Sequence, residues 1–266
     1  MMHRMIAAGR WVILGLLGTS SALHAQSLAG RVAAFGTGAV NFHFAARPGV
    51  CGDGLRFMRI GRSYLGNWSS DMRSQPCAAG PVQIRVTLRD GAIERVEAWV
   101  GTLRARDGRD LGEVSSKLGA EYLLGIAARG AGSASSKAIL PAVLADSATV
   151  WPALLAIARD SATRSGATRQ DAAFWLSRFA ASAVAGKGHD LLDDGEDDDR
   201  DAGSTEDLKK HALFVLSQLA NHEGVPTLLD IARSNADRRV RGQALFWLGQ
   251  SGDPRALALF ESLLRD

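Results

Sequence analysis

The chain has 266 residues, 46% of them hydrophobic and 22% charged, and this balance excludes a disordered or collagen-like polymer. A formal net charge of +3 and only two cysteines exclude a strongly basic nucleic-acid binder and a disulfide-dense mini-protein. A folded protein of more than one domain is expected.

Residues 1–25 are predicted to be a cleaved secretion signal. Arg4 and Arg10 give a positive start, residues 11–18 are apolar, and small residues follow up to a cleavage point between Ala25 and Gln26. The apolar stretch is much shorter than the roughly 20 residues that cross a bilayer. We therefore expect a periplasmic or secreted protein without a transmembrane anchor.

The next segment has the alternating pattern of β-strands. Residues 82–89 alternate apolar and polar side chains, residues 93–100 resume an extended pattern, and Asp90-Gly91 between them is a strong hairpin signal. Residues 40–44 predict another strand. The sequence thus predicts a small β-rich domain over residues 27–108.

Cys51 and Cys77 both fall in this β-rich domain. In an oxidising compartment we expect them to form a disulfide, which would stabilise the fold by about 3 kcal/mol. A metal site is a weaker alternative, because zinc takes about four ligands and His43 is the nearby imidazole. A reactive thiol is the other alternative.

One phrase, Ala-x-Phe-x-Leu, recurs three times in the second half of the chain. A helix that is apolar on nearly all sides is normally buried between neighbours, so the phrase predicts a buried helix. A basic residue precedes each copy by three positions, for which we expect a hydrogen-bonding ladder between neighbouring turns, with ligand binding as the alternative. The predicted repeat core is Ala172, Phe174, Leu176, Ala212, Phe214, Leu216, Ala244, Phe246 and Leu248.

A second phrase is interleaved with the first and predicts the partner helices. Residues 151–159 and 225–233 share a Pro, a Leu-Leu pair and an Ile-Ala-Arg ending, and residues 252–257 open a looser copy. Proline suits the first turn of a helix, where its missing N–H has no partner. Each unit is therefore a helical hairpin that must stack on its neighbours.

These phrases resemble HEAT-like repeats of the short class called the PBS-lyase type, over about residues 110–266. Residues 41–54 are similar to the front end of exported bacterial HEAT-repeat proteins that are otherwise uncharacterised. The resemblance implies an α-solenoid over residues 109–266 and a role in protein binding. The predicted fold class is α+β multidomain, with the disulfide-stapled β-rich domain followed by the solenoid.

An acidic insertion interrupts the repeats at residues 186–205. Residues 190–207 hold ten acidic residues and one Arg, a composition that predicts a solvated, disordered loop. Calcium binding is an alternative, since Asp197, Asp199 and Asp201 alternate as in an EF-hand loop, but Ala202 and Leu208 stand where such a loop needs Gly and Glu. Docking on a basic surface is the third alternative.

No constellation of nucleophile, base, phosphate loop or metal ligands has a usable spacing. We therefore expect a non-catalytic interaction or scaffold protein, with no cofactor, no metal and no nucleic acid, that contacts another protein or peptide. The alternative is a β-rich domain that binds a small ligand or glycan, or is a cryptic hydrolase, supported by the repeats. Trp68 and nearby arginines motivate this alternative, whereas Trp99 is expected to pack in the core. The arginines are Arg56, Arg59, Arg62 and Arg73.

Overall fold

The computed structural model describes residues 27–55, 57–61, 63–65, 77–129, 132–160, 166–185 and 212–265. The predicted signal peptide with Ala25 and Gln26, the loop around Trp68 and the acidic insertion lie outside the described residues. Those expectations stay predictions.

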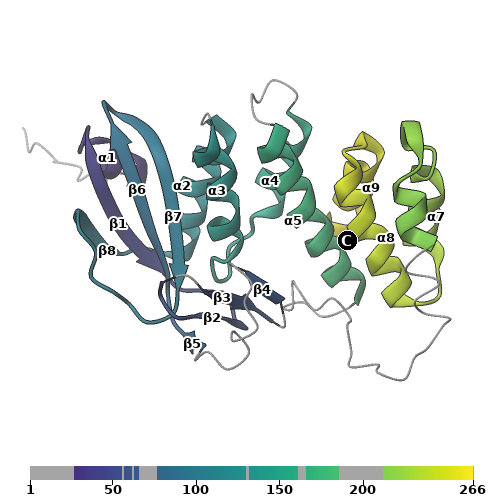
Figure 1. Ribbon diagram of the computed structural model, residues 1–266, viewed down its shortest axis with the longest axis horizontal. Helices are drawn as coiled ribbons and strands as arrows, with labels where there is room; N and C mark the ends of the chain where they lie inside the picture. The colour runs from purple at the N-terminus through teal and green to yellow at the C-terminus, as the bar shows by residue number, and fades with distance from the viewer. Residues whose placement is uncertain are drawn as a thin grey trace, which may run out of the picture.

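A four-stranded sheet forms one end of the molecule, with strand order β7-β6-β1-β8 (Figure 1). The predicted hairpin is confirmed, because Asp90 and Gly91 turn with φ of 51° and 77° between two antiparallel strands. β8 pairs parallel to β1. The strands are β1 (Gly38–Phe44), β6 (Val82–Arg89), β7 (Ala92–Val100) and β8 (Arg109–Glu113).

A second, smaller sheet has the order β4-β3-β2-β5. The predicted disulfide is confirmed: Cys51 in β2 is bonded to Cys77, which directly precedes β5. The bond therefore joins the two strands at one edge of this sheet. The strands are β2 (Val50–Gly52), β3 (Met58–Ile60), β4 (Ser63–Leu65) and β5 (Ala78–Ala79).

Three helices pack against one face of the main sheet, α1 (Leu28–Ala33), α2 (Ser116–Arg129) and α3 (Ser133–Val143). Residues 109–113, predicted to begin the helical part, are held in the sheet as β8, and α2 begins at Ser116. The main sheet therefore extends past the boundary predicted after residue 108.

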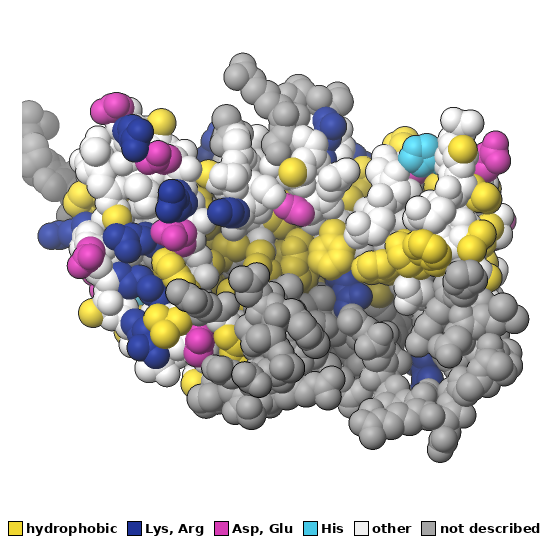
Figure 2. Space-filling model, viewed as in Figure 1, with side chains coloured by type: hydrophobic (Ala, Val, Ile, Leu, Met, Phe, Trp, Pro, Cys, Tyr) yellow, Lys and Arg dark blue, Asp and Glu magenta, His cyan; other side chains and the backbone are white. Residues whose placement is uncertain are grey.

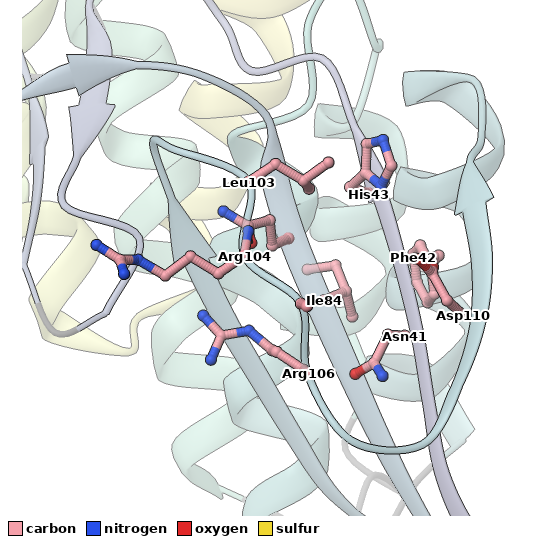
Figure 3. Close-up of a pocket in the computed structure, with 10 residues that line it drawn as sticks. Asn41, Phe42, His43, Ile84, Leu103, Arg104, Arg106 and Asp110 are labelled. Atoms are coloured by element: carbon pink, nitrogen blue, oxygen red, sulfur yellow. The ribbon is translucent and has the colours of Figure 1, made fainter.

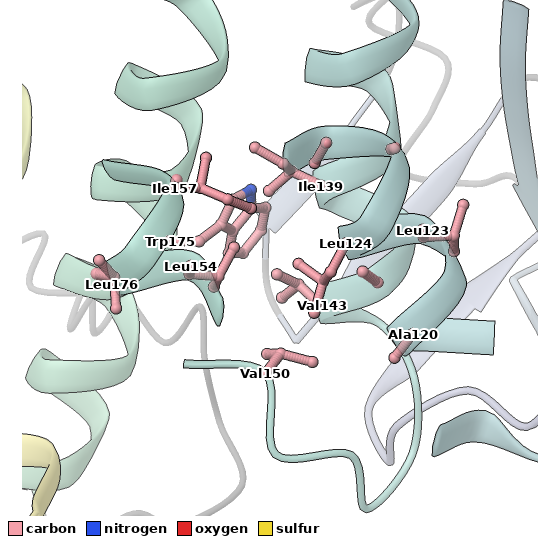
Figure 4. Packing of buried hydrophobic residues seen from close by; sticks show 14 of the residues in the cluster. Ala120, Leu123, Leu124, Ile139, Val143, Val150, Leu154, Ile157, Trp175 and Leu176 are labelled. Atoms are coloured by element: carbon pink, nitrogen blue, oxygen red, sulfur yellow. The ribbon is translucent and has the colours of Figure 1, made fainter. Parts of the chain in front are cut away.

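The hydrophobic core continues from this sheet into the helices without interruption. Ile84 of β6, Leu123 of α2 and Ile139 of α3 are almost fully buried in one cluster, which extends to Leu154 and Leu176 of the following helices (Figure 4). The strand half and the helical half thus share one core.

The remaining helices form a row of hairpins beyond α3 (Figure 1). As predicted, a proline stands in the first turn of three of them: Pro152, Pro226 and Pro254. The helices are α4 (Trp151–Arg159), α5 (Gly166–Ala185), α7 (Val225–Ser234), α8 (Arg238–Ser251) and α9 (Pro254–Arg265), with a further helical turn at residues 212–217.

The hairpins do not lie in chain order. α8 packs between α5 on one side and α7 on the other, and α9 contacts both α4 and α5 (Figure 1). Residues 212–217 and α7 therefore occupy the far end of the row, although they precede α8 and α9 in the chain. The predicted stacking of hairpins is present, but the order expected for a simple solenoid is not.

A small residue makes the contact between α5 and α8 possible. A Cβ on Gly249 would lie 2.6 Å from Cβ of Ser177 and 3.2 Å from the Ala173 carbonyl oxygen. Gly249 and Ser177 are the small residues that directly follow Leu in two of the three phrases. The recurring Ser or Gly is thus the point where the two helices touch.

Asp253 lies in the turn between α8 and α9 and contacts the turn that precedes α7. It is buried, caps α9 by accepting from the Arg255 backbone N–H at 2.8 Å, and lies 3.9 Å from Nδ1 of His222 in the neighbouring turn. The hydrogen bond from the Arg255 side chain is the main reason that the pKa of Asp253 is lowered. The charged carboxylate is therefore the form that the folded state prefers.

We expect replacement of Asp253 by Asn to remove a pH-dependent part of the stability. Because the folded pKa is lowered, this stabilisation is present at neutral pH and is lost as the pH falls from about 4 through the folded value. Asn remains a good helix cap, so the cap itself is kept. Urea unfolding of both proteins from neutral pH to about pH 3 should show a difference that shrinks with acidity. A difference independent of pH would contradict this account.

Candidate functional site

The predicted repeat core is only partly buried. Ala172, Leu176, Ala244 and Leu248 are at most 1% exposed, whereas Phe214 is 41% exposed. Phe174, Phe246 and Leu216 are half-buried and Ala212 is exposed. Burial was therefore the wrong prediction for Ala212 and Phe214, which lie in the helical turn of residues 212–217 at the end of the described row of helices.

The phenylalanines of the three phrases are brought into one line of aromatic rings. Ring centroids are 6.2 Å apart between Phe174 and Phe246, 5.0 Å between Phe246 and Trp247, and 5.3 Å between Trp247 and Phe214. Val215, 46% exposed, stands next to Phe214. We call these five residues the aromatic stripe.

The aromatic stripe crosses three helical segments that are distant in sequence, because it runs from α5 over α8 to residues 212–217. Edge-to-face and tilted ring pairs at these separations are favourable contacts that hold the rings in place. Figure 2 shows a band of hydrophobic side chains across the helical half of the molecule. Contiguous exposed apolar patches of this kind mark interaction surfaces in soluble domains.

The basic residues ahead of the phrases have a structural role where they are described. Arg241 donates to the carbonyl oxygens of Asn235 and Ala236, at 2.5 and 3.3 Å, and Arg169 donates to that of Asp160 at 3.4 Å. Both arginines thus bind the turn that precedes their own helix. The predicted ladder between neighbouring turns stays a prediction. The third, Lys209, lies outside the described residues.

Comparison with known families finds a match in the C-terminal helices. Residues 200–266 match the family model of HEAT repeats. The HEAT match covers residues 212–217 and α7 to α9, and so includes Phe214, Val215, Phe246 and Trp247 of the aromatic stripe. The finer assignment to the PBS-lyase type stays a prediction. No curated protein and no solved structure matches the chain.

In the part of the chain that the structure describes, no three His, Cys, Asp or Glu side chains come together in a way that could hold a metal ion. None of the helices in that part is both long enough and apolar enough to cross a membrane.

Trp99 does not pack in the core as expected. The strand register places Trp99 opposite Gln83, on the face of the main sheet away from the helices, while the adjacent Val100 is fully buried. The guanidinium carbon of Arg106 lies 3.5 Å from the centre of the Trp99 ring. The outer face of the sheet is therefore covered by side chains and loop rather than by helices.

Proposed function

We propose that this chain is an exported, non-catalytic interaction protein that docks an apolar segment of another protein on the aromatic stripe. The observation that carries the proposal is the line of partly exposed rings, three of which lie on helical segments that match HEAT repeats. HEAT repeats commonly mediate protein interactions, and rigid, stacked hairpins present an extended surface for them.

The aromatic stripe is rich in the residue types that contribute most to the affinity of protein interfaces. Aromatic anchors dominate protein interfaces, and a few of them at the centre supply most of the affinity. The four rings contact one another before any partner arrives, so little side-chain entropy is lost on docking. A segment that carries leucine or aromatic side chains is the partner that this surface fits.

Export of the protein is part of the proposal. The disulfide between Cys51 and Cys77 favours an oxidising compartment, and it is compatible with the predicted signal peptide. Fractionation of the source cells, with amino-terminal sequencing of the recovered protein, tests this part. Cleavage between Ala25 and Gln26 is expected.

Selection of peptides on the immobilised protein tests the docking surface. A random displayed peptide library should yield sequences rich in leucine and aromatic residues. We expect the affinity of the selected peptides to fall at least about tenfold in Phe214→Ser, because a truncated aromatic anchor typically costs 1.4 kcal/mol or more. Fluorescence anisotropy with labelled peptide measures the change.

Phe35 provides a matched control, because it is 38% exposed but lies in the strand half. The Phe35→Ser variant should bind the selected peptides as the unaltered protein does. Selected peptides without apolar residues, or equal losses in both variants, would contradict the proposal.

A second candidate function is binding of a small ligand by the strand half. The observation in its favour is a pocket of about 260 Å³ on the outer face of the main sheet.

A further inference from the structure

The chain between β7 and β8 crosses the outer face of the main sheet. β7 and β8 are the two edges of that sheet, so residues 101–108 have to pass over it. Gln83 of β6 and Asn41 of β1 hydrogen-bond to the backbone of these residues and hold them on the sheet. We call residues 101–108 the arch. The arch therefore lies at the surface, on the side of the sheet away from the helices.

The two most exposed large apolar side chains that the structure describes lie on the arch and beside it. Leu103 of the arch is 54% exposed, and Leu55, in the turn between β2 and β3, is 48% exposed. The backbones of the arch and this turn lie close together, since a Cβ on Gly54 would be 2.6 Å from the Thr102 carbonyl oxygen. A single exposed leucine needs no explanation, but two on adjoining segments indicate a contact surface.

Arginine side chains of the arch hold the turn against it. Arg104 donates from Nε and Nη2 to the Asp53 carbonyl oxygen, at 3.3 and 3.2 Å. Arg106 donates from Nη2 to the Gly54 carbonyl oxygen at 2.6 Å. In Figure 3 the side chains of Leu103 and Arg104 extend from the arch in different directions. The two exposed leucines are therefore carried by backbone segments that are fixed to each other.

The surface around the two leucines is basic. Arg104 is exposed and Arg106 is half-buried. Burial lowers the pKa of Arg106, and the nearby charges of Arg85 and Arg104 lower it further, so three guanidinium groups lie near one another. Residues 26–110 hold twelve arginines and seven acidic residues, and Lys and Arg side chains are frequent on this half of the molecule (Figure 2). This excess is complementary to an anionic surface.

Exposed leucines next to arginines fit a lipid bilayer with anionic headgroups better than they fit other classes of partner. The planar guanidinium forms paired hydrogen bonds with phosphate oxygens. An apolar side chain gains free energy when it leaves water for the boundary between headgroups and acyl chains. A soluble polyanion would meet only the arginines, and an apolar peptide would meet only the leucines.

We propose that Leu55 and Leu103, with the arginines around them, bind the surface of an anionic lipid bilayer. The two leucine side chains enter the boundary between headgroups and acyl chains. The guanidinium groups of Arg85, Arg104 and Arg106 lie among the lipid phosphates. The aromatic stripe is on the helical half, so a protein partner can still bind there while the strand half is on the membrane.

Flotation with lipid vesicles tests the proposal. The protein used begins at Gln26, so that it keeps every residue the structure describes and lacks the apolar residues 11–18, which could bind lipid by themselves. We expect binding to vesicles of phosphatidylcholine with phosphatidylglycerol, much weaker binding to phosphatidylcholine alone, and a fall in binding as the salt concentration rises. No binding to the anionic vesicles, or equal binding to both kinds, would overturn the proposal.

The Leu55→Ser/Leu103→Ser variant tests the apolar part of the contact. Its affinity for the anionic vesicles should fall at least about tenfold, because the two leucine side chains no longer leave water on binding. Both positions are exposed, so circular dichroism should show a folded variant. Val215→Ser is the matched control, because Val215 is 46% exposed but lies on the helical half. Equal vesicle binding by the double variant and the control would contradict the proposed contact.

Polyglutamate distinguishes a membrane from a soluble acidic partner. We expect the unaltered protein and the double variant to bind polyglutamate equally weakly, because only the arginines contact it. Tighter binding to polyglutamate than to the anionic vesicles would show that this face takes an acidic protein, and the membrane proposal would be wrong. None of these results bears on peptide binding at the aromatic stripe.

Discussion

Replacement of Arg47 by Met is expected to lower the free energy of unfolding by about 3 kcal/mol, because it leaves buried carbonyl groups without a donor. Arg47 follows β1 and donates from Nε to the Val143 carbonyl oxygen and from Nη2 to that of Ala148, both at 2.7 Å. Its backbone N–H also donates to the Leu144 carbonyl oxygen. One residue thus joins the strand half to the end of α3.

Part of the loss is offset in the variant, because burying the Arg47 guanidinium is itself costly. Burial lowers the pKa of Arg47, and the nearby Asp146 partly opposes that change. The side chain also lies over the Phe179 ring at 5.5 Å. Lys is expected to rescue the variant only in part, since an ammonium group cannot reproduce the two directed hydrogen bonds of the guanidinium.

Urea unfolding followed by far-UV circular dichroism measures the loss. Arg89→Met is the matched control, because Arg89 forms an exposed ion pair with Glu94, and such pairs contribute at most about 1 kcal/mol. A stability of Arg47→Met equal to that of the control would show that the contact does not hold the halves together.

Removal of the disulfide is the second change with a large expected effect. The bond between Cys51 and Cys77 spans 26 residues of chain, and loss of such a closed loop costs about 3 kcal/mol in the chain-entropy model. The Cys51→Ala/Cys77→Ala variant should therefore melt at a lower temperature than the unaltered protein, as measured by calorimetry.

Dithiothreitol supplies an internal control for this prediction. The reductant should lower the melting temperature of the unaltered protein towards that of the double variant, and leave the double variant unchanged. If the unaltered protein melted at the same temperature with and without the reductant, the proposed stabilisation would be wrong.

The elements that the sequence predicted well are those whose signals are local. The hairpin at Asp90-Gly91 follows from turn residues that tolerate positive φ, and the proline-led helices follow from the missing N–H of proline. The pairing of the two cysteines was also predicted. The hairpin and the helix starts depend on a few adjacent residues. The disulfide depends on there being only two cysteines, whatever their separation in sequence.

The order of the hairpins was not predicted, for a physical reason. The three phrases are nearly alike, so their sequences do not indicate which two of the helices that carry them lie side by side. For the same reason, the sequence did not indicate that residues 212–217 lie at the end of the row, where Phe214 and Val215 are exposed.

The pocket was also missed, because its walls are distant in sequence. Asn41, Gln83 and Arg106 come from two strands and a loop, and only the pairing of β1 with β6 brings them together. The one available signal was a polar residue between the apolar residues Val40 and Phe42. Sequence reasoning selected Trp68 and its neighbouring arginines instead, of which only Arg59 lies among the described residues.

Site-specific photocross-linking in the source cells tests most directly the claim that the aromatic stripe contacts another protein. A benzophenone side chain at position 214 should give one recurrent adduct of defined mass, whereas the same group at position 35 should not. The adduct should weaken when Phe246→Ser is added, because Phe246 belongs to the same stripe. Equal cross-linking at both positions, or none at position 214, would contradict the account.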